Sequence, residues 1–197
     1  MSRRVSRAEA WDLLTEWVSS ESLRRHCLAV SASMAAYAEK TGEDVELWEV
    51  TGLLHDMDYE RHPDMDDAEA GHPRTAMKVL SDLDVDPAVV RAIASHADYM
   101  GVSRDTPMEK TLAAVDELSG FVVAVAAIRP TGVHGLTPKS VKKKLKTPAF
   151  AAAVSREEIA ANAEALGVDF DEHVRTVIAA IEARADELDL NGSEAAA

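Results

Sequence analysis

Hydrophobic residues recur along the chain at spacings of three and four positions, which place them on one face of an α-helix. Glycine and proline are sparse, and they lie between these periodic segments rather than inside them. The sequence contains no convincing run of alternating polar and apolar residues, which is the pattern of a half-buried β-strand. The pattern therefore predicts an all-α fold, in which amphipathic helices bury their apolar faces against one another.

Capping signals mark where the predicted helices begin and end. Ser6 with Glu9 and Thr106 with Glu109 have capping-box spacing, Ser155 with Glu158 caps another predicted helix, and Gly42 is typical of a helix C-terminus. At 86–87 and at 106–107, an N-cap residue precedes a proline at the first helical position. The predicted helices cover about residues 6–18, 21–40, 44–55, 72–82, 86–96, 106–128, 155–167 and 169–188, with a short lysine-rich helix from 138.

The composition fits a single globular core. The chain has 197 residues, of which 47% are hydrophobic and 28% are charged, as in ordinary soluble proteins. The formal net charge is -14, so we expect the protein to repel nucleic acid and anionic membranes. The single Cys27 cannot form an internal disulfide, which favours a reducing cytoplasm. The first residues lack the apolar segment of a signal peptide, and the longest apolar run, 121–128, is too short to span a bilayer.

Three titratable residues are predicted to lie at or near the apolar faces of the second and third helices. Leu23 precedes His26 by three positions and Val30 follows it by four, so His26 shares their face. His55 and Asp56 come directly after the apolar end of the third helix. The sequence therefore predicts that the end of this helix presents an imidazole and a carboxylate from two adjacent, rigidly held residues.

Two further residues follow the same pattern. His96 ends the fifth predicted helix, after an apolar stretch. Asp116 lies within a long apolar helix, and it shares a face with Leu112 and Val123. A buried carboxylate is costly unless it is paired, hydrogen-bonded or bound to a metal.

Inward polar groups on four helices suggest that they converge on one point. Imidazole nitrogens and carboxylate oxygens without useful thiols suit one or two divalent transition-metal ions, namely Fe, Mn, Ni, Co or Zn. His55 can hold one ion, while the two oxygens of Asp56 can bridge to a second. The alternative is a set of satisfied core histidines and helix-capping aspartates. That alternative explains any one residue well, but it explains the set poorly because independent accidents rarely all fall on inward faces.

The order His26, His55-Asp56, Asp116 resembles the H…HD…D signature of the HD-domain superfamily of metal-dependent phosphohydrolases. The segment LLHDMDY resembles the LLHDIG-type segment of that family, and the resemblance covers about residues 20–130. More narrowly, GLLHDMDYE, SHADYMGV and AVDELSGFVVAVAAIRP are similar to a widespread bacterial group of HDIG-type predicted hydrolases.

The resemblance implies an all-α HD-domain helical bundle with additional C-terminal helices. It divides the chain into an N-terminal helix packing on the core at 1–19, the HD metal-binding domain at 20–130, a C-terminal helical extension at 131–190 and a disordered tail at 191–197. Ser95 replaces one histidine of the double-histidine motif of cyclic-di-GMP phosphodiesterases, and no GYP follows. The chain therefore departs from that branch of the superfamily.

The resemblance also implies a ligand set for two metal ions. His72, in GHPRTAMKVL, is similar to the H-P-x-x-[GA] segment of two-metal HD proteins, and His96, in SHADYMG, is similar to their next metal histidine. One ion would take His26, His55, Asp56 and Asp116, and the other would take Asp56, His72 and His96. Four histidines and two aspartates are also the ligands of HD-type di-iron oxygenases.

The implied reaction is attack on a phosphate ester by a metal-activated water. Asp56 would bridge the ions, and Asp116 or Asp58 would accept a proton from the water. Asp58-Tyr59 stands where many HD hydrolases have Gly-Lys, so no lysine role carries over to this position. The expected substrate contacts are Arg25, Tyr59, Arg129 and Lys143.

Other polar residues leave alternatives open. The lysine-rich segment 139–146 either guides an anionic substrate or forms the solvated face of an amphipathic helix. His62 and His134 are expected in exposed loops, and His173 is expected on the surface of the last helix. Tyr99 either contacts substrate or packs.

Three functions are compatible with these observations. The first is hydrolysis of a small anionic substrate, namely a phosphorylated metabolite or a nucleotide. The second is an O₂-dependent oxygenase reaction at a di-iron centre. The third is a regulatory metal-binding domain, which predicts a pocket too small or too apolar for a phosphate. We expect no nucleic-acid partner and no membrane, and the sequence is compatible with a homodimer.

Overall fold

The computed structural model describes residues 3–193, and within this range it is all-helical apart from a single bridge between Arg3 and Val85. The α-helices are α1 Arg7–Trp17, α2 Glu21–Thr41, α3 Val45–Leu54, α4 Arg74–Asp82, α5 Pro87–His96, α6 Pro107–Ala127, α7 Pro138–Leu145, α8 Arg156–Leu166 and α9 Phe170–Glu182. A short 3₁₀ helix, η1 Asp98–Met100, follows α5. The all-α prediction is confirmed. Residues 194–197 of the predicted tail lie outside the described range.

The predicted capping boxes are present at the starts of α1 and α6. At α1, Ser6 and Glu9 form a reciprocal capping box, and Thr106 and Glu109 form another at α6. The last helix ends at Glu182, six residues earlier than the sequence predicts. Hydrogen-bonded turns follow it, and they allow both Leu188 and Leu190 to be buried.

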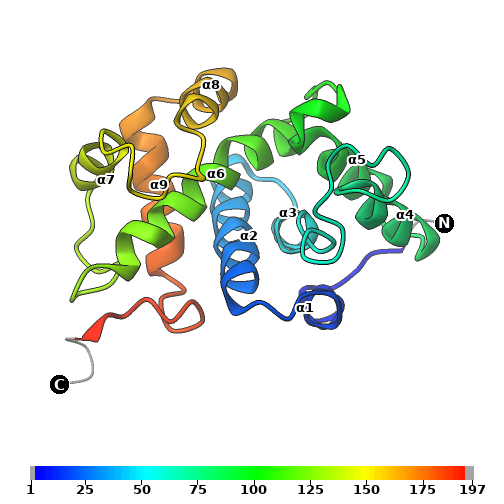
Figure 1. Cartoon of the computed structure of the whole chain (residues 1–197), viewed down its shortest axis with the longest axis horizontal. Coiled ribbons are helices and arrows are strands. Elements are labelled where there is room, and N and C mark those ends of the chain that lie inside the picture. Colours follow the sequence, from blue (N-terminus) through cyan, green and yellow to red (C-terminus); the bar gives the residue numbers. More distant parts are fainter. Residues whose placement is uncertain (1–2, 194–197) are drawn as a thin grey trace.

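Helix α2 lies at the centre of the molecule (Figure 1). Helix α3 packs against it, and α6 crosses it. In Figure 1, α4 and α5 lie beyond α3 on one side, and α7, α8 and α9 lie on the other. One hydrophobic core runs through both sides and includes residues of the predicted C-terminal extension. The domain boundaries stay a prediction. In residues 3–193, no helix has the length and apolar character needed to cross a membrane.

The close approach of α2 and α3 depends on a glycine. A Cβ atom added at Gly52 would lie 2.7 Å from the Cα of Ser31, which is closer than real Cβ contacts. The Ser31 hydroxyl also donates a hydrogen bond to the carbonyl oxygen of Glu49 at 2.9 Å. These contacts bring the polar end of α3 beside His26 on α2.

Helix α9 is joined to α2 and α6 by a buried histidine. His173 is fully buried, its Nδ1 lies 2.6 Å from the hydroxyl of Tyr37, and its Nε2 lies 3.0 Å from the carbonyl oxygen of Ala114. The prediction that His173 lies on the surface is wrong. Its helix buries it because Val174 and Val177 on the same helix also face the core.

We expect His173 to make stability depend on pH. Burial lowers the pKa of His173, although its hydrogen bond to Ala114 opposes this. The neutral form therefore stabilises the fold above about pH 6.5, and this contribution is lost as the pH falls below that value. His173→Gln should lose about 1–3 kcal/mol at neutral pH and should lose less further stability on acidification than the wild type. Urea denaturation at about pH 7.5 and about pH 5.5 measures both effects. Equal acid sensitivity of the two proteins would contradict the assignment.

Candidate metal centre

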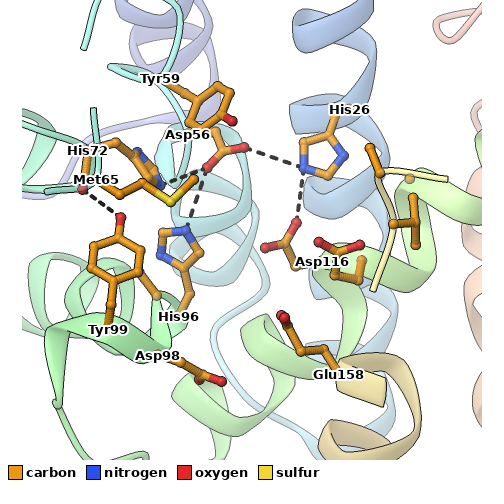
Figure 2. Close-up of a pocket in the computed structure, with 15 residues that line it drawn as sticks. His26, Asp56, Tyr59, Met65, His72, His96, Asp98, Tyr99, Asp116 and Glu158 are labelled. Carbon is orange, nitrogen blue, oxygen red and sulfur yellow. Dashed lines mark hydrogen bonds and ion pairs between the residues drawn. The ribbon is translucent and has the colours of Figure 1, made fainter. Parts of the chain in front are cut away.

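Five segments deliver the six predicted metal ligands to one place, and Figure 2 shows these ligands except His55. His26 comes from α2, and His96 is the last residue of α5. His55 and Asp56 follow the last turn of α3. His72 precedes α4, and Asp116 lies within α6. The structure therefore brings together residues that span 90 positions of the sequence, from 26 to 116.

Asp56 lies between two groups of histidines. Its Oδ2 is 3.6 Å from the Nε2 of His26 and 3.5 Å from that of His55. Its Oδ1 is 3.3 Å from the Nε2 of His72 and 3.5 Å from that of His96. Each oxygen of one carboxylate thus faces a separate potential metal position, as expected of a bridging ligand.

Asp116 belongs to the first of these groups. Its Oδ1 is 3.0 Å from the Nε2 of His26 and 3.4 Å from that of His55. The two imidazole Nε2 atoms are themselves 3.2 Å apart. Four ligand atoms therefore surround the first position, and three surround the second.

The hydrogen bonds around the histidines point their lone pairs into the cluster. The Nδ1 atoms of His55 and His96 lie 2.8 Å and 2.6 Å from the carbonyl oxygens of Gly52 and Ile93. A carbonyl oxygen only accepts, so each Nδ1 carries the hydrogen and each neutral ring presents an Nε2 lone pair. The Nδ1 atom of His72 is held in the same way by the carboxylate of Asp58. The Nε2 lone pairs of these histidines then face carboxylate oxygens. A cation placed between them would interact favourably with both kinds of atom. The residues fit one or two divalent metal ions.

The electrostatics of the cluster point the same way. Burial alone would lower the pKa of His55, but the carboxylates of Asp56 and Asp116 raise it to about 9. Burial alone would raise the pKa values of both aspartates, but the neighbouring histidines lower them instead. The cluster is therefore a partly buried site that attracts positive charge, which a divalent ion would supply.

Asp58 supports the site from behind. It is fully buried, and its Oδ1 accepts a hydrogen bond from Nδ1 of His72 at 2.7 Å. Its Oδ2 accepts another from the backbone N–H of Ala76 at 2.8 Å. Asp58 lies behind the histidine, so the expectation that it accepts a proton from the water is replaced by a positioning role. The sequence could not separate these roles because both require an aspartate near the ligands.

A cavity of about 410 Å³ opens onto the cluster, a size suited to a small ligand. Five of the six ligand residues, all except His55, line it directly, together with Tyr59, which was expected to contact substrate. Tyr99 also lines it, and its hydroxyl donates a hydrogen bond to the carbonyl oxygen of His72 at 2.6 Å. Gly120 leaves room for the ring of His26, because an added Cβ would lie 3.3 Å from its Nδ1.

The cations expected to bind substrate do not line this cavity. Arg25 faces Asp189, with 3.5 Å between guanidinium nitrogen and carboxylate oxygen. Arg129 and Lys143 line a different cavity, where α6 ends beside α7. A helical rise of 1.5 Å per residue puts Arg129 about 20 Å beyond Asp116 along α6, which explains the separation.

The lysine-rich helix α7 is a solvated amphipathic helix. Val141 is fully buried, and Leu145 packs against the core. Lys142 forms an ion pair with Asp171 at 2.5 Å. Of the two alternatives for this segment, the structure shows the solvated face and places it away from the candidate metal centre.

Three acidic residues that line the cavity were missed as site residues, namely Asp98, Glu117 and Glu158. Burial and the adjacent Asp116 raise the pKa of Glu117 to about 7, although its hydrogen bond from the Ser155 N–H opposes this. The sequence indicates only that Ser155 and Glu158 cap a helix. The cap itself is present, but the side chain of Glu158 is free of it and turns toward the cavity (Figure 2).

The comparison with protein families agrees with this geometry. Residues 23–120 match the model of the HD domain. The chain therefore belongs to the HD-domain superfamily, a largely metal-dependent and hydrolase-type superfamily of helical proteins. No curated protein and no solved structure matches the chain.

Removing ligands should empty the two metal positions selectively. Asp56→Ala should abolish binding at both positions because its carboxylate faces both. His96→Ala should lose only the second ion, because the first position keeps its four ligand atoms. Elemental analysis of the purified variants gives the number of ions per chain. Metal content that is unchanged in both variants would show that the site is assigned wrongly.

Asp58→Asn should weaken the second metal position without removing it. An asparagine side chain has one acceptor oxygen, so it cannot accept from both His72 and Ala76. Loss of a residue that hydrogen-bonds a metal ligand typically lowers the metal affinity 10- to 100-fold, and we expect a loss of about that size here. Chelator competition measures the affinity, and Asp66→Asn in the neighbouring exposed loop is the matched control. An unchanged affinity in Asp58→Asn would argue against the positioning role.

Proposed function

We propose that this protein is a metal-dependent phosphohydrolase that acts on a small phosphorylated metabolite or nucleotide. The observation that carries the proposal is the shared carboxylate of Asp56, whose two oxygens face separate groups of imidazole nitrogens. Two divalent ions bound there would lower the pKa of a coordinated water and hold a phosphate oxygen. The fit of the donor set and membership of the superfamily both support this chemistry.

The side chains around the cavity would divide the remaining work. Asp56 would keep the two ions at a fixed separation, and Asp58 would keep the His72 ring in the tautomer that binds metal. Of the two aspartates expected to accept a proton, Asp116 lines the cavity and Asp58 does not. We therefore retain Asp116 as the proton acceptor. Tyr59 is 37% exposed and lines the same cavity, so it would contact the bound substrate.

The ligand count supports a second candidate, an oxygenase reaction at a di-iron centre. Four histidines and two aspartates converge here, and HD-type di-iron oxygenases use this set. The third candidate, a regulatory metal site, predicted a pocket too small or too apolar for a phosphate. The cavity of about 410 Å³ and its carboxylate-rich lining argue against that candidate.

Phosphate release and O₂ consumption distinguish the phosphohydrolase from the oxygenase. Protein loaded with Mn, Co, Ni or Zn should release phosphate from members of a phosphatase and nucleotidase panel. Asp56→Ala should lower that rate at least about a thousandfold, because metal ions contribute several kcal/mol to transition-state stabilisation. Asp12→Asn, an exposed aspartate on α1, is the control. Two irons per chain with O₂ consumption and no phosphate release would favour the oxygenase.

A further inference from the structure

The candidate metal cavity has a second wall, which comes from outside the matched HD domain. Ala153, Val154 and Glu158 line the cavity opposite the metal ligands, and all three belong to the C-terminal part of the chain. In Figure 2, Glu158 extends from α8 toward the space between Asp98 and Asp116. The residues most able to distinguish substrates therefore lie on this wall rather than among the metal ligands.

Arg156 fixes the shape of this wall. Its guanidinium donates hydrogen bonds to the carbonyl oxygens of Ala151 at 2.7 Å and Val154 at 2.6 Å, and also to that of Phe150. The same group lies over the ring of Phe121 on α6, 5.2 Å from its centroid. One side chain thus ties the turn before α8 to the HD domain, and this holds the first turn of α8 against the cavity.

The charges on the cavity lining are unusual for a phosphate site. Within residues 3–193, the lining includes no lysine and no arginine. Asp98 is neutralised by an ion pair with Arg104, and Glu117 accepts a hydrogen bond from the Ser155 N–H at 3.0 Å. The carboxylate of Glu158 has no hydrogen bond or ion pair with another residue in the described part of the chain. The metal ions would then be the cations available to a phosphate.

A carboxylate beside such a cavity repels one kind of substrate and favours another. A second anionic group on the substrate would lie close to Glu158, and the like charges would repel each other. A cationic nitrogen would instead be attracted, and Tyr99, which is 44% exposed, offers it an aromatic face.

We propose that Glu158 sets the substrate class: the substrate carries a cationic nitrogen on the same small molecule as the oxyanion that the metal ions hold. This inference rests on the proposed function, because it assumes that an oxyanion binds at the metal centre. It adds that the other end of the substrate is an ammonium group or a similar cation, held by Glu158. An uncharged or acidic end would lack this partner.

The test compares two phosphate esters that differ only in an ammonium group, phosphoethanolamine and ethyl phosphate. Calorimetric titration of the Mn-loaded protein should show at least about tenfold tighter binding of phosphoethanolamine, which corresponds to about 1.4 kcal/mol. Glu158→Gln should bring the ratio of the two affinities close to one, and Glu158→Lys should reverse the preference. Glu157→Gln is the matched control, because it removes the same charge from the same helical turn and both residues are exposed, but Glu157 does not line the cavity.

The outcomes separate this inference from the proposed function. Equal affinity of the wild type for the two esters would overturn the inference and leave the phosphohydrolase proposal standing. A preference that survives in Glu158→Gln would also overturn it, provided that elemental analysis shows unchanged metal content. Binding of neither ester would contradict the inference and the proposed function together.

Discussion

The carboxylate of Asp56 is the group on which the whole site depends. Its oxygens face two pairs of imidazole nitrogens, and the histidine Nδ1 hydrogen bonds leave lone pairs directed at those oxygens. Burying acceptors against acceptors is costly without a positive charge between them. A metal ion on each side of Asp56 would supply this positive charge, which supports the proposed binuclear centre.

The surrounding fold serves to hold these groups in register. Gly52 lets α3 approach α2 closely enough for the ends of two helices to share a site. Asp58 fixes one histidine through a buried hydrogen bond. On the far side, Arg156 ties the turn before α8 to the HD domain and thereby completes the cavity wall. The C-terminal helices are thus part of the site, and they share one hydrophobic core with the rest of the chain.

The sequence predicted that these side chains face inward, because helical phase is a local property. Spacings of three and four residues were enough to show that His26 and Asp116 face inward, and the family resemblance added His72 and His96. The all-α class and the main helix caps followed from equally local signals. All six ligands lie within the segment that the HD domain matches.

Contacts between residues far apart in the sequence could not be predicted from such local spacings. Arg129 and Lys143 were expected to bind substrate, but Arg129 lies beyond the far end of the long α6, and Lys143 lies on α7 beside that end. Glu158 looked like a capping residue, and only the packing of α8 across the cavity gives it another use. His173 lies in an ordinary amphipathic pattern, and its partner Tyr37 is 136 residues away. Which helix faces meet is decided by tertiary packing, and no local pattern encodes it.

Anomalous diffraction from crystals of the metal-loaded protein would show whether two metal ions lie on either side of Asp56. We expect two anomalous peaks, one beside Oδ2 with His26, His55 and Asp116, and one beside Oδ1 with His72 and His96. A single peak bound by the first set would reduce the centre to one metal. The absence of any peak within coordination distance of Asp56 would show that these residues do not form a metal centre.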